Sequence, residues 1–145
     1  MNCKNVQPVF AGEFPKFVTE AINKAQNGID IIVFDWRWYP SDPACAAQQF
    51  NNALVAAVKR GVQVRVVTNC DAVAQFLRKV GIQVKKPISA RLLHSKLMII
   101  DRKCVVIGSH NYTQNAFTSN FEVSVILSDC DDTTELDQYF NSLFF

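Results

Sequence analysis

Short apolar runs alternate along the chain with longer stretches of helical periodicity. Apolar residues recur at three- and four-residue spacing over 14–26 and again over 42–60, which predicts two amphipathic helices. Between them, residues 29–36 read IDIIVFDW, a near-continuous apolar run typical of a central strand covered on both faces. This alternation of strand and helix predicts an α/β fold.

Residues at the ends of these segments support the same pattern. Gly28 is expected to end the first helix, and Asp42 to be the N-cap of the second, with Pro43 in its first turn. Pro8 suggests that the first apolar run is either an edge strand or an irregular start. The other expected elements are strands over 6–10, 62–68, 82–85, 97–100, 104–107 and 121–127, helices over 71–80 and 131–145, and a loop or short helix over 113–120.

Length and composition fit one domain over residues 1–145. Apolar residues make up 49% of the sequence, enough for one core, and the net charge of +2 permits nucleic-acid binding without requiring it. The chain has no run of 18 apolar residues, and its N-terminus lacks an apolar signal-peptide segment. We therefore expect a mixed β-sheet with helices on both faces and no transmembrane segment.

The five cysteines bear on metal binding and on location. They include no C-x-x-C pair, which argues against a zinc site. Free thiols favour a reducing compartment, so a cytoplasmic location is expected, with a processed secreted or periplasmic chain as the alternative. One or two disulfides are compatible with the sequence.

Polar side chains gather where two neighbouring apolar strands, 97–100 and 104–107, are expected to meet. The four residues concerned are His94, Lys96, Ser109 and Asn111. Within each pair the spacing is two residues, which places both side chains on the same face of an extended segment. An imidazole, an ammonium group, a hydroxyl and an amide would then converge. That set suits a phosphate group, because it offers a nucleophile, a fixed cation and neutral donors.

The spacing of these residues resembles the signature of the phospholipase D superfamily. The resemblance is carried by His94, Lys96 and Asp101 of an H-x-K-x4-D motif, by Gly108, Ser109 and Asn111 of a G-S-x-N motif, and by Glu122 beyond them. The motif occurs once, so the chain is more similar to the small, endonuclease-like branch than to the two-motif phospholipases. The resemblance implies a phospholipase D-like α/β/α sandwich.

The same resemblance implies a mechanism. In that family one histidine attacks phosphorus to form a covalent phosphohistidine, and a second histidine protonates the leaving oxygen. Here His94 would be the nucleophile, while Lys96 and Asn111 would hold the non-bridging oxygens. Ser109 would assist them, and Glu122 would orient the imidazole.

A second histidine must come from somewhere. Strand parity turns His110 away from the site, so a homodimer that brings together His94 of two chains is expected. The rival is a monomer that uses His110 or water as the acid. Asp101 and Gly108 are expected to be structural. No cofactor is expected, and the two histidines and scattered carboxylates do not predict a metal site.

Nucleic acid, DNA or RNA, is the expected substrate of this predicted phosphodiesterase. The candidates for contact with it are Trp36, Arg37, Lys85, Lys86 and Arg91. For the aromatic segment 36–40, core packing, base stacking and a membrane-interface cluster all stay open. Asp35 is expected either in the site or as a loop cap. Two other functions also stay open, namely a phospholipase D or phosphatidyl transferase, and a catalytically idle DNA-binding domain on the same fold.

Overall fold

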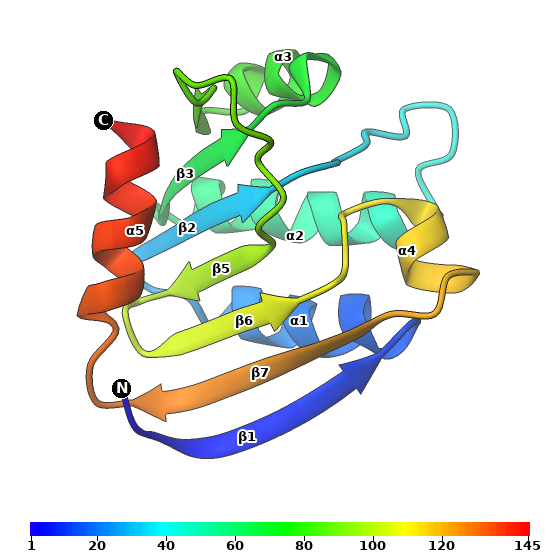
Figure 1. Cartoon of the computed structure of the whole chain (residues 1–145). Helices are drawn as coiled ribbons and strands as arrows, with labels where there is room; N and C mark the ends of the chain where they lie inside the picture. Colours follow the sequence, from blue (N-terminus) through cyan, green and yellow to red (C-terminus); the bar gives the residue numbers. More distant parts are fainter.

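The computed structural model describes all 145 residues and is built on one mixed sheet (Figure 1). The strands are β1 (Cys3–Phe10), β2 (Gly28–Val33), β3 (Gln63–Thr68), β4 (Gln83–Lys85), β5 (Leu97–Ile100), β6 (Cys104–Gly108) and β7 (Val123–Cys130). They lie in the order β1-β7-β6-β5-β2-β3-β4. β2, β3 and β4 run parallel, and the other neighbouring pairs are antiparallel. The predicted mixed sheet, with its first strand at an edge, is confirmed.

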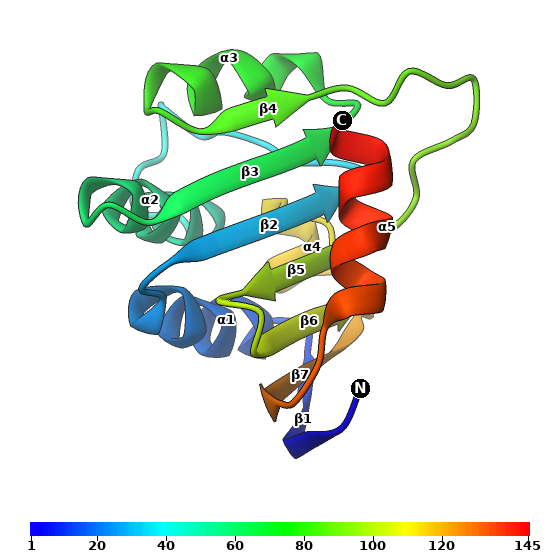
Figure 2. The ribbon, with the colours of Figure 1, turned by 90° about the vertical axis from the view of Figure 1, so that its left-hand side faces the viewer.

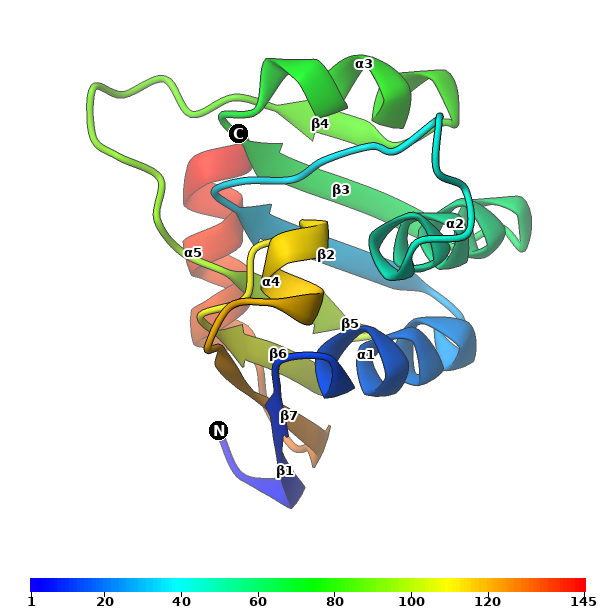
Figure 3. The same ribbon diagram turned by 90° about the vertical axis from the view of Figure 1, so that its right-hand side faces the viewer.

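Helices cover both faces of this sheet, but unequally (Figures 2 and 3). The five helices are α1 (Glu13–Lys24), α2 (Ala46–Lys59), α3 (Asp71–Lys79), α4 (Gln114–Thr118) and α5 (Thr134–Phe144). The first four pack with one face of the sheet in a core of 29 buried residues, and α5 packs alone on the other face in a smaller core. The arrangement is the predicted α/β/α sandwich.

The apolar run in β2 is explained by this double coverage. Ile29 and Ile31 belong to the larger core, whereas Ile32 belongs to the core under α5. All three side chains are fully buried, since successive residues on a strand point to opposite faces. β2 lies between β5 and β3, as expected of a central strand.

The face that α5 covers is left open over β6, β7 and β1 (Figure 1). Apolar side chains are exposed there, and we call this set the open apolar face. It is made of Val6, Phe10, Ile107 and Val123, with 65%, 56%, 44% and 49% exposure. The register pairs Phe10 with Val123, and Ile107 with the residue two beyond Val123, so these side chains share one face. Contiguous exposed apolar surface of this kind commonly marks an interaction site.

The start of α2 differs from the sequence-based expectation. The helix begins at Ala46, and the Sγ atom of its N-cap, Cys45, accepts a hydrogen bond from the backbone N–H of Gln48 (3.4 Å). Asp42 lies instead in a turn, where its backbone N–H donates to the Tyr39 carbonyl and its own carbonyl accepts from Cys45. An Asp-Pro pair suits a turn as well as a helix start, because proline presets the same backbone φ in both.

Two of the five cysteines form a disulfide, Cys3–Cys130, between residues paired across β1 and β7. It closes a loop of 127 residues, which in the chain-entropy model stabilises the fold by about 5 kcal/mol. Cys45, Cys70 and Cys104 are free. Burial raises the pKa of the Cys104 thiol to about 11, so this residue behaves as a small apolar side chain.

Candidate active site

The predicted site residues come from segments that meet where β5 begins and β6 ends. His94 and Lys96 precede β5, and Ser109 and Asn111 follow β6. β5 and β6 are antiparallel and pair Leu97 with Ile107, so the start of one strand adjoins the end of the other. Glu122 comes just before β7, and the start of β7 pairs with the end of β6.

His94 and Lys96 form the centre of this cluster. The Lys96 Nζ lies 3.3 and 3.4 Å from the two ring nitrogens of His94, and it donates to the His94 backbone carbonyl at 2.9 Å. His94 is exposed and Lys96 is half-buried. Burial lowers the pKa of Lys96, and the nearby Glu122 carboxylate opposes this shift. A nucleophile and a cation are thus within reach of the same phosphate group.

The amide of Asn111 is held in a defined orientation. Its Oδ1 accepts a hydrogen bond from the backbone N–H of Asp35 (3.1 Å). That bond commits the oxygen to the protein and leaves both amide hydrogens free to donate to a substrate. Asn111 sits where the chain after β6 runs beside the chain after β2, since Tyr112 donates its backbone N–H to the Asp35 carbonyl (3.0 Å).

Ser109 and Glu122 form a pair of their own. The Ser109 hydroxyl donates to the Glu122 carboxylate and accepts the backbone N–H of Val123 (3.1 Å). Glu122 also accepts from the Asn120 amide (3.3 Å), and it makes no hydrogen bond to His94 of the same chain. Orientation of His94 by Glu122 is therefore not observed within one protomer.

Gly108 is required by close packing. A Cβ atom at this position would lie 2.3 to 2.5 Å from atoms of Ser124 on the neighbouring strand. The Ser124 hydroxyl is in turn bonded to His110 Nδ1 (2.8 Å). The glycine of the G-S-x-N motif thus brings β6 against β7 and supports a buried polar pair behind the site, as its expected structural role requires.

His110 is a buried structural residue, as strand parity predicts. Its Nδ1 is bonded to Ser124, its Nε2 to the Ala11 carbonyl (3.1 Å), and its ring stacks on Phe14 with centroids 4.3 Å apart. The pKa of His110 is lowered, because the effect of burial exceeds the opposing effects of the Ala11 carbonyl and Glu122. Because both ring nitrogens are engaged inside the protein, His110 is badly placed to act as the general acid.

Asp101 is bonded to the backbone of a neighbouring segment. It lies in the tight turn between β5 and β6, where both Asp101 and Arg102 have positive φ. Its carboxylate accepts the backbone N–H groups of Gln26, Asn27 and Gly28 at 2.8 to 3.0 Å. Burial alone would raise the pKa of Asp101, but these donors outweigh it and the pKa is lowered. The motif aspartate thus ties the hairpin to the turn before β2.

One predicted contact residue is corrected by the structure. Trp36 is fully buried and donates its Nε1–H to Asn51 Oδ1 (2.7 Å), so it belongs to the core and cannot bind substrate. Arg37 remains available, with its side chain 61% exposed and paired with Asp35 (2.9 Å). Asp35 thereby lies beside the site and neutralises a neighbouring cation.

Three basic candidates lie on the approach to the motif. Lys85, Lys86 and Arg91 are all exposed, and Lys86 pairs with Asp71 (2.9 Å).

No group of three His, Cys, Asp or Glu side chains is placed to hold a metal ion. No helix has the length and apolar character needed to cross a membrane.

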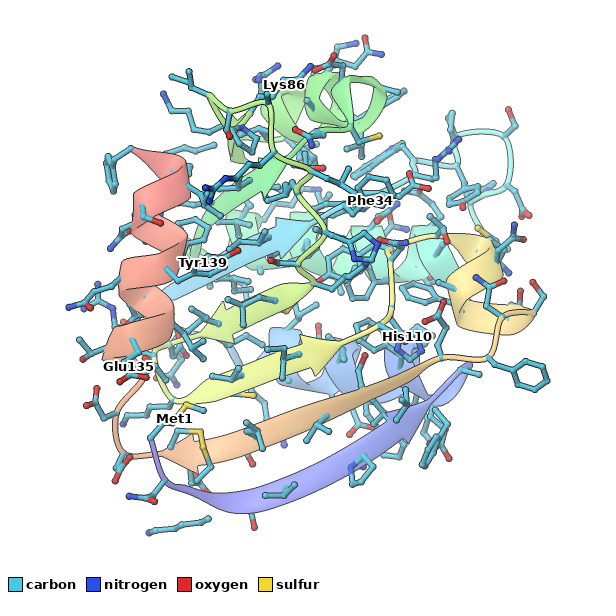
Figure 4. The ribbon with its side chains drawn as sticks, in the orientation of Figure 1. Met1, Phe34, Lys86, His110, Glu135 and Tyr139 are labelled. Atoms are coloured by element: carbon cyan, nitrogen blue, oxygen red, sulfur yellow. A yellow bond between two sulfur atoms is a disulfide. The ribbon has the colours of Figure 1, made fainter.

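Phe34 is a residue of the site that sequence patterns do not reveal. It follows β2 directly, and its ring lies 5.5 Å from the His94 ring and 5.7 Å from the Lys96 Nζ (Figure 4 labels it). An aromatic ring under an ammonium group contributes a cation–π attraction as well as packing. In the sequence, Phe34 is indistinguishable from the apolar run before it.

We expect Phe34→Leu to lower kcat about 3- to 10-fold with little change in KM, because the ring positions the nucleophile and the cation without reaching the substrate. Phe34→Tyr, which keeps the ring, should retain the wild-type rate. Steady-state kinetics on bis(p-nitrophenyl) phosphate measure both parameters. Equal kcat values for wild type and Phe34→Leu would show that the ring has no positioning role.

Comparison with known proteins shows the family to which the chain belongs. A family profile described as "Cardiolipin synthase, PLD-like domain" matches residues 18–144, which is most of the chain. The chain belongs to the phospholipase D superfamily. Its fold and single motif agree with that membership.

Curated relatives include mitochondrial cardiolipin hydrolases. The chain is 37% identical to the mouse (Mus musculus) protein over 92 residues, covering 59% of this chain and 42% of that protein. It is 32% identical to the human (Homo sapiens) protein over 122 residues, covering 80% and 44%. The chain thus spans less than half the length of these relatives.

Among solved structures, the fold matches Nuc from Salmonella typhimurium, described as a phospholipase D family member. The TM-score is 0.81 with 25% identity, over 96% of this chain and 93% of Nuc. NucT from Helicobacter pylori matches with a TM-score of 0.77 at 18% identity, over 96% of both chains. The second likeness concerns the fold alone.

Proposed function

We propose that the protein is a metal-independent, sequence-nonspecific nuclease that works through a covalent intermediate on His94. The observation that carries the proposal is the convergence of an exposed imidazole, a lysine ammonium within 3.4 Å of it, and an asparagine amide oriented by the backbone. The two fixed donors supply the charge stabilisation that many nucleases obtain from divalent cations.

The proposed reaction has two displacement steps. A ring nitrogen of His94 attacks phosphorus, so that a P–N bond forms while the P–O bond to the leaving group breaks. The leaving oxygen takes a proton from a second imidazole. That imidazole then removes a proton from water, the resulting hydroxide attacks phosphorus, and the P–N bond breaks. Lys96 and Asn111 hold the non-bridging oxygens throughout, because negative charge on them persists in both steps.

Nucleic acid is favoured as the substrate by the charges around the site. Arg37, Lys85 and Arg91 are exposed, and such cations attract the phosphates that flank a scissile diester. No base-reading module accompanies them, which supports the absence of sequence preference. An intact set of polar residues makes a catalytically idle binding domain the weaker alternative.

A phospholipid diester is the second candidate substrate. The curated relatives are named cardiolipin hydrolases, although the chain spans less than half of each. Ile88 and Leu92 are also exposed in the segment that leads to His94, with exposures of 104% and 68%. Exposed apolar side chains next to basic ones suit a lipid–water interface.

A substrate panel in excess EDTA tests the proposal. Labelled DNA and RNA should be cleaved at the same rate with and without chelator, whereas vesicles of phosphatidylcholine or cardiolipin should be left intact. Loss of nuclease activity in EDTA with recovery on adding magnesium would refute the metal-independent mechanism. Cleavage of the lipids alone would show that the substrate is a phospholipid diester, the second candidate.

We further propose that the active form is a homodimer with one shared site. Each chain has a single motif histidine, and His110, its only other histidine, is held in the core by bonds at both ring nitrogens. Glu122 makes no bond to its own His94, and its carboxylate oxygens, which accept one hydrogen bond each from Ser109 and Asn120, can accept a further one from the partner's imidazole. Phe121, which precedes Glu122 in the sequence, is fully exposed and can take part in an interface between two protomers.

The open apolar face supports this assembly, because it reaches the site. A shallow hollow beside the site is lined by Phe10, Ser109, Phe121, Glu122 and Val123, which joins catalytic and exposed apolar residues. An isologous contact across this surface would remove the apolar side chains from water and bring two copies of the site together.

We expect Phe10→Glu to yield a monomer and to lower activity about 100-fold or more, since a buried carboxylate opposes association and a monomer lacks the second imidazole. Ile88→Glu is the control for the mass, because Ile88 is also apolar and exposed but lies away from the open apolar face, so this variant should remain a dimer. Light scattering after gel filtration gives the mass, and the diester assay gives the rate. A fully active monomer of Phe10→Glu would contradict the shared site.

The disulfide alters the proposed location. The expectation of a cytoplasmic protein rested on free thiols, and Cys3–Cys130 removes two of the five. Structural disulfides persist mainly in oxidising compartments. We therefore propose an oxidising environment, periplasmic or secreted, as the site of action.

A further inference from the structure

A polar hollow is lined by Asp35, the residue whose backbone N–H is bonded to Asn111 of the proposed site. It has a volume of about 420 Å³ and is formed by the loop after β2 and by the N-cap and first residues of α4. The two segments shown in Figure 3 meet here, since Arg37 donates its backbone N–H to the Tyr112 carbonyl (3.0 Å). Asp35 lines the hollow with its side chain and bonds Asn111 with its backbone N–H (3.1 Å). Asp35 therefore links the hollow to Asn111 of the site.

The aromatic wall of this hollow is fixed by contacts on its outer side. The indole of Trp38 stacks on Phe76 of α3, with centroids 5.7 Å apart and planes only 3° from parallel. The hydroxyl of Tyr39 accepts the backbone N–H of Gln114 (2.7 Å). Both rings line the hollow, and both are held in place without any ligand. Rigid aromatic side chains of this kind bind flat ligands at low entropic cost.

Two polar side chains that line the hollow, Arg37 and Asn115, have hydrogen-bonding groups without a partner in the protein. Arg37 uses its Nε and Nη2 atoms on the Asp35 carboxylate, at 2.9 and 3.4 Å, which leaves its Nη1 free. The side-chain amide of Asn115 is exposed and makes no hydrogen bond within the protein. An amide offers both a donor and an acceptor, so it can pair with the polar edge of a heterocycle.

We propose that this hollow is a subsite for a nucleobase of the nucleotide attached to the scissile phosphate. The inference rests on the proposed nuclease function and deepens it. A nucleobase combines a flat face for Trp38 with a polar edge for Asn115 and Arg37, and stacking of this kind tolerates every base. An acyl chain fits poorly, because it would remove the Asp35–Arg37 pair from water without replacing its hydrogen bonds.

The subsite also explains the aromatic segment that follows β2. Trp36 and Trp38 are two residues apart, yet the first is in the core and the second lines the hollow. The segment therefore combines two of the interpretations that its composition allows, with core packing for Trp36 and base stacking for Trp38.

A comparison of two diesters tests the subsite in the full-length protein. The substrates are a thymidine dinucleotide and the matching abasic dinucleotide, which keeps the sugar–phosphate diester but has no aromatic ring. Asn115→Ala should raise KM for the thymidine dinucleotide about 3- to 10-fold, and Trp38→Leu about 5- to 100-fold, in both cases more than for the abasic diester. Asn23→Ala is the matched control, because Asn23 is an exposed asparagine on α1, remote from the hollow. Equal KM changes for the two diesters would overturn the subsite.

A binding measurement separates failure of the subsite from failure of the nuclease proposal. In the inactive His94→Asn chain, the dinucleotide should quench the fluorescence of Trp38, while Trp36 stays shielded in the core. Asn115→Ala on the same background should weaken this binding by a similar 3- to 10-fold factor. Quenching without any nucleic-acid hydrolysis by the wild type would support the subsite and refute the nuclease. Hydrolysis without quenching would do the reverse.

Discussion

Replacing His94 with asparagine should abolish turnover, with a loss of at least about 10⁴-fold in kcat, while the protein stays folded. The loss of a nucleophile on which both chemical steps depend typically has an effect of this size. His94 is exposed, with its ring near Lys96 and Phe34, so little packing is lost. The measurement is kcat on bis(p-nitrophenyl) phosphate, together with the thermal midpoint of each protein.

Ser95→Ala is the matched control for that variant. Ser95 is the next residue along the chain, but its hydroxyl bonds Tyr139 of α5 (2.8 Å) and not the site residues. It should therefore keep most of the activity. The wild type should also form a base-stable phosphoryl adduct on rapid quenching, and His94→Asn should not. A folded His94→Asn protein with near-wild-type turnover would eliminate the covalent mechanism.

The position of the site, where β5 begins and β6 ends, could be predicted because it depends on local sequence patterns. Period-two alternation places His94 with Lys96, and Ser109 with Asn111, and the tight turn at Asp101 then brings the two pairs together. Strand parity also correctly predicted that the side chain of His110 points into the protein. These inferences need only the covalent spacing of residues and the pairing of two neighbouring strands.

Features that depend on distant contacts could not be predicted in the same way. The Cys3–Cys130 bond requires the register of β1 on β7, which brings residues 127 apart in the sequence into contact. The burial of Trp36 depends on its bond to Asn51 of α2, and the role of Phe34 on where β5 begins. Local propensity likewise misplaced the start of α2, because an Asp-Pro pair is compatible with both a turn and a helix start.

Mixing active and inactive chains should reveal whether two protomers share one site. Wild type and His94→Ala chains are unfolded together in urea and refolded without reductant, so that Cys3–Cys130 stays intact. A mixed dimer then has one motif histidine where the reaction needs two. Because general acid catalysis contributes about 10²- to 10⁴-fold, such dimers should be nearly inactive. Activity per wild-type chain should therefore fall in proportion to the fraction of mutant chains.

The alternative gives a clearly different curve. If each protomer had its own complete site, with water or His110 as the acid, activity per wild-type chain would stay constant at every mixing ratio. A tag on the mutant chains shows by co-purification that mixed dimers have formed, and mixing with Ser95→Ala chains controls for losses on refolding. A constant activity per wild-type chain in demonstrably mixed dimers would therefore exclude the shared site. A proportional fall would require that each His94 depends on the histidine of the other protomer, since neither ring nitrogen of His110 is free to replace it.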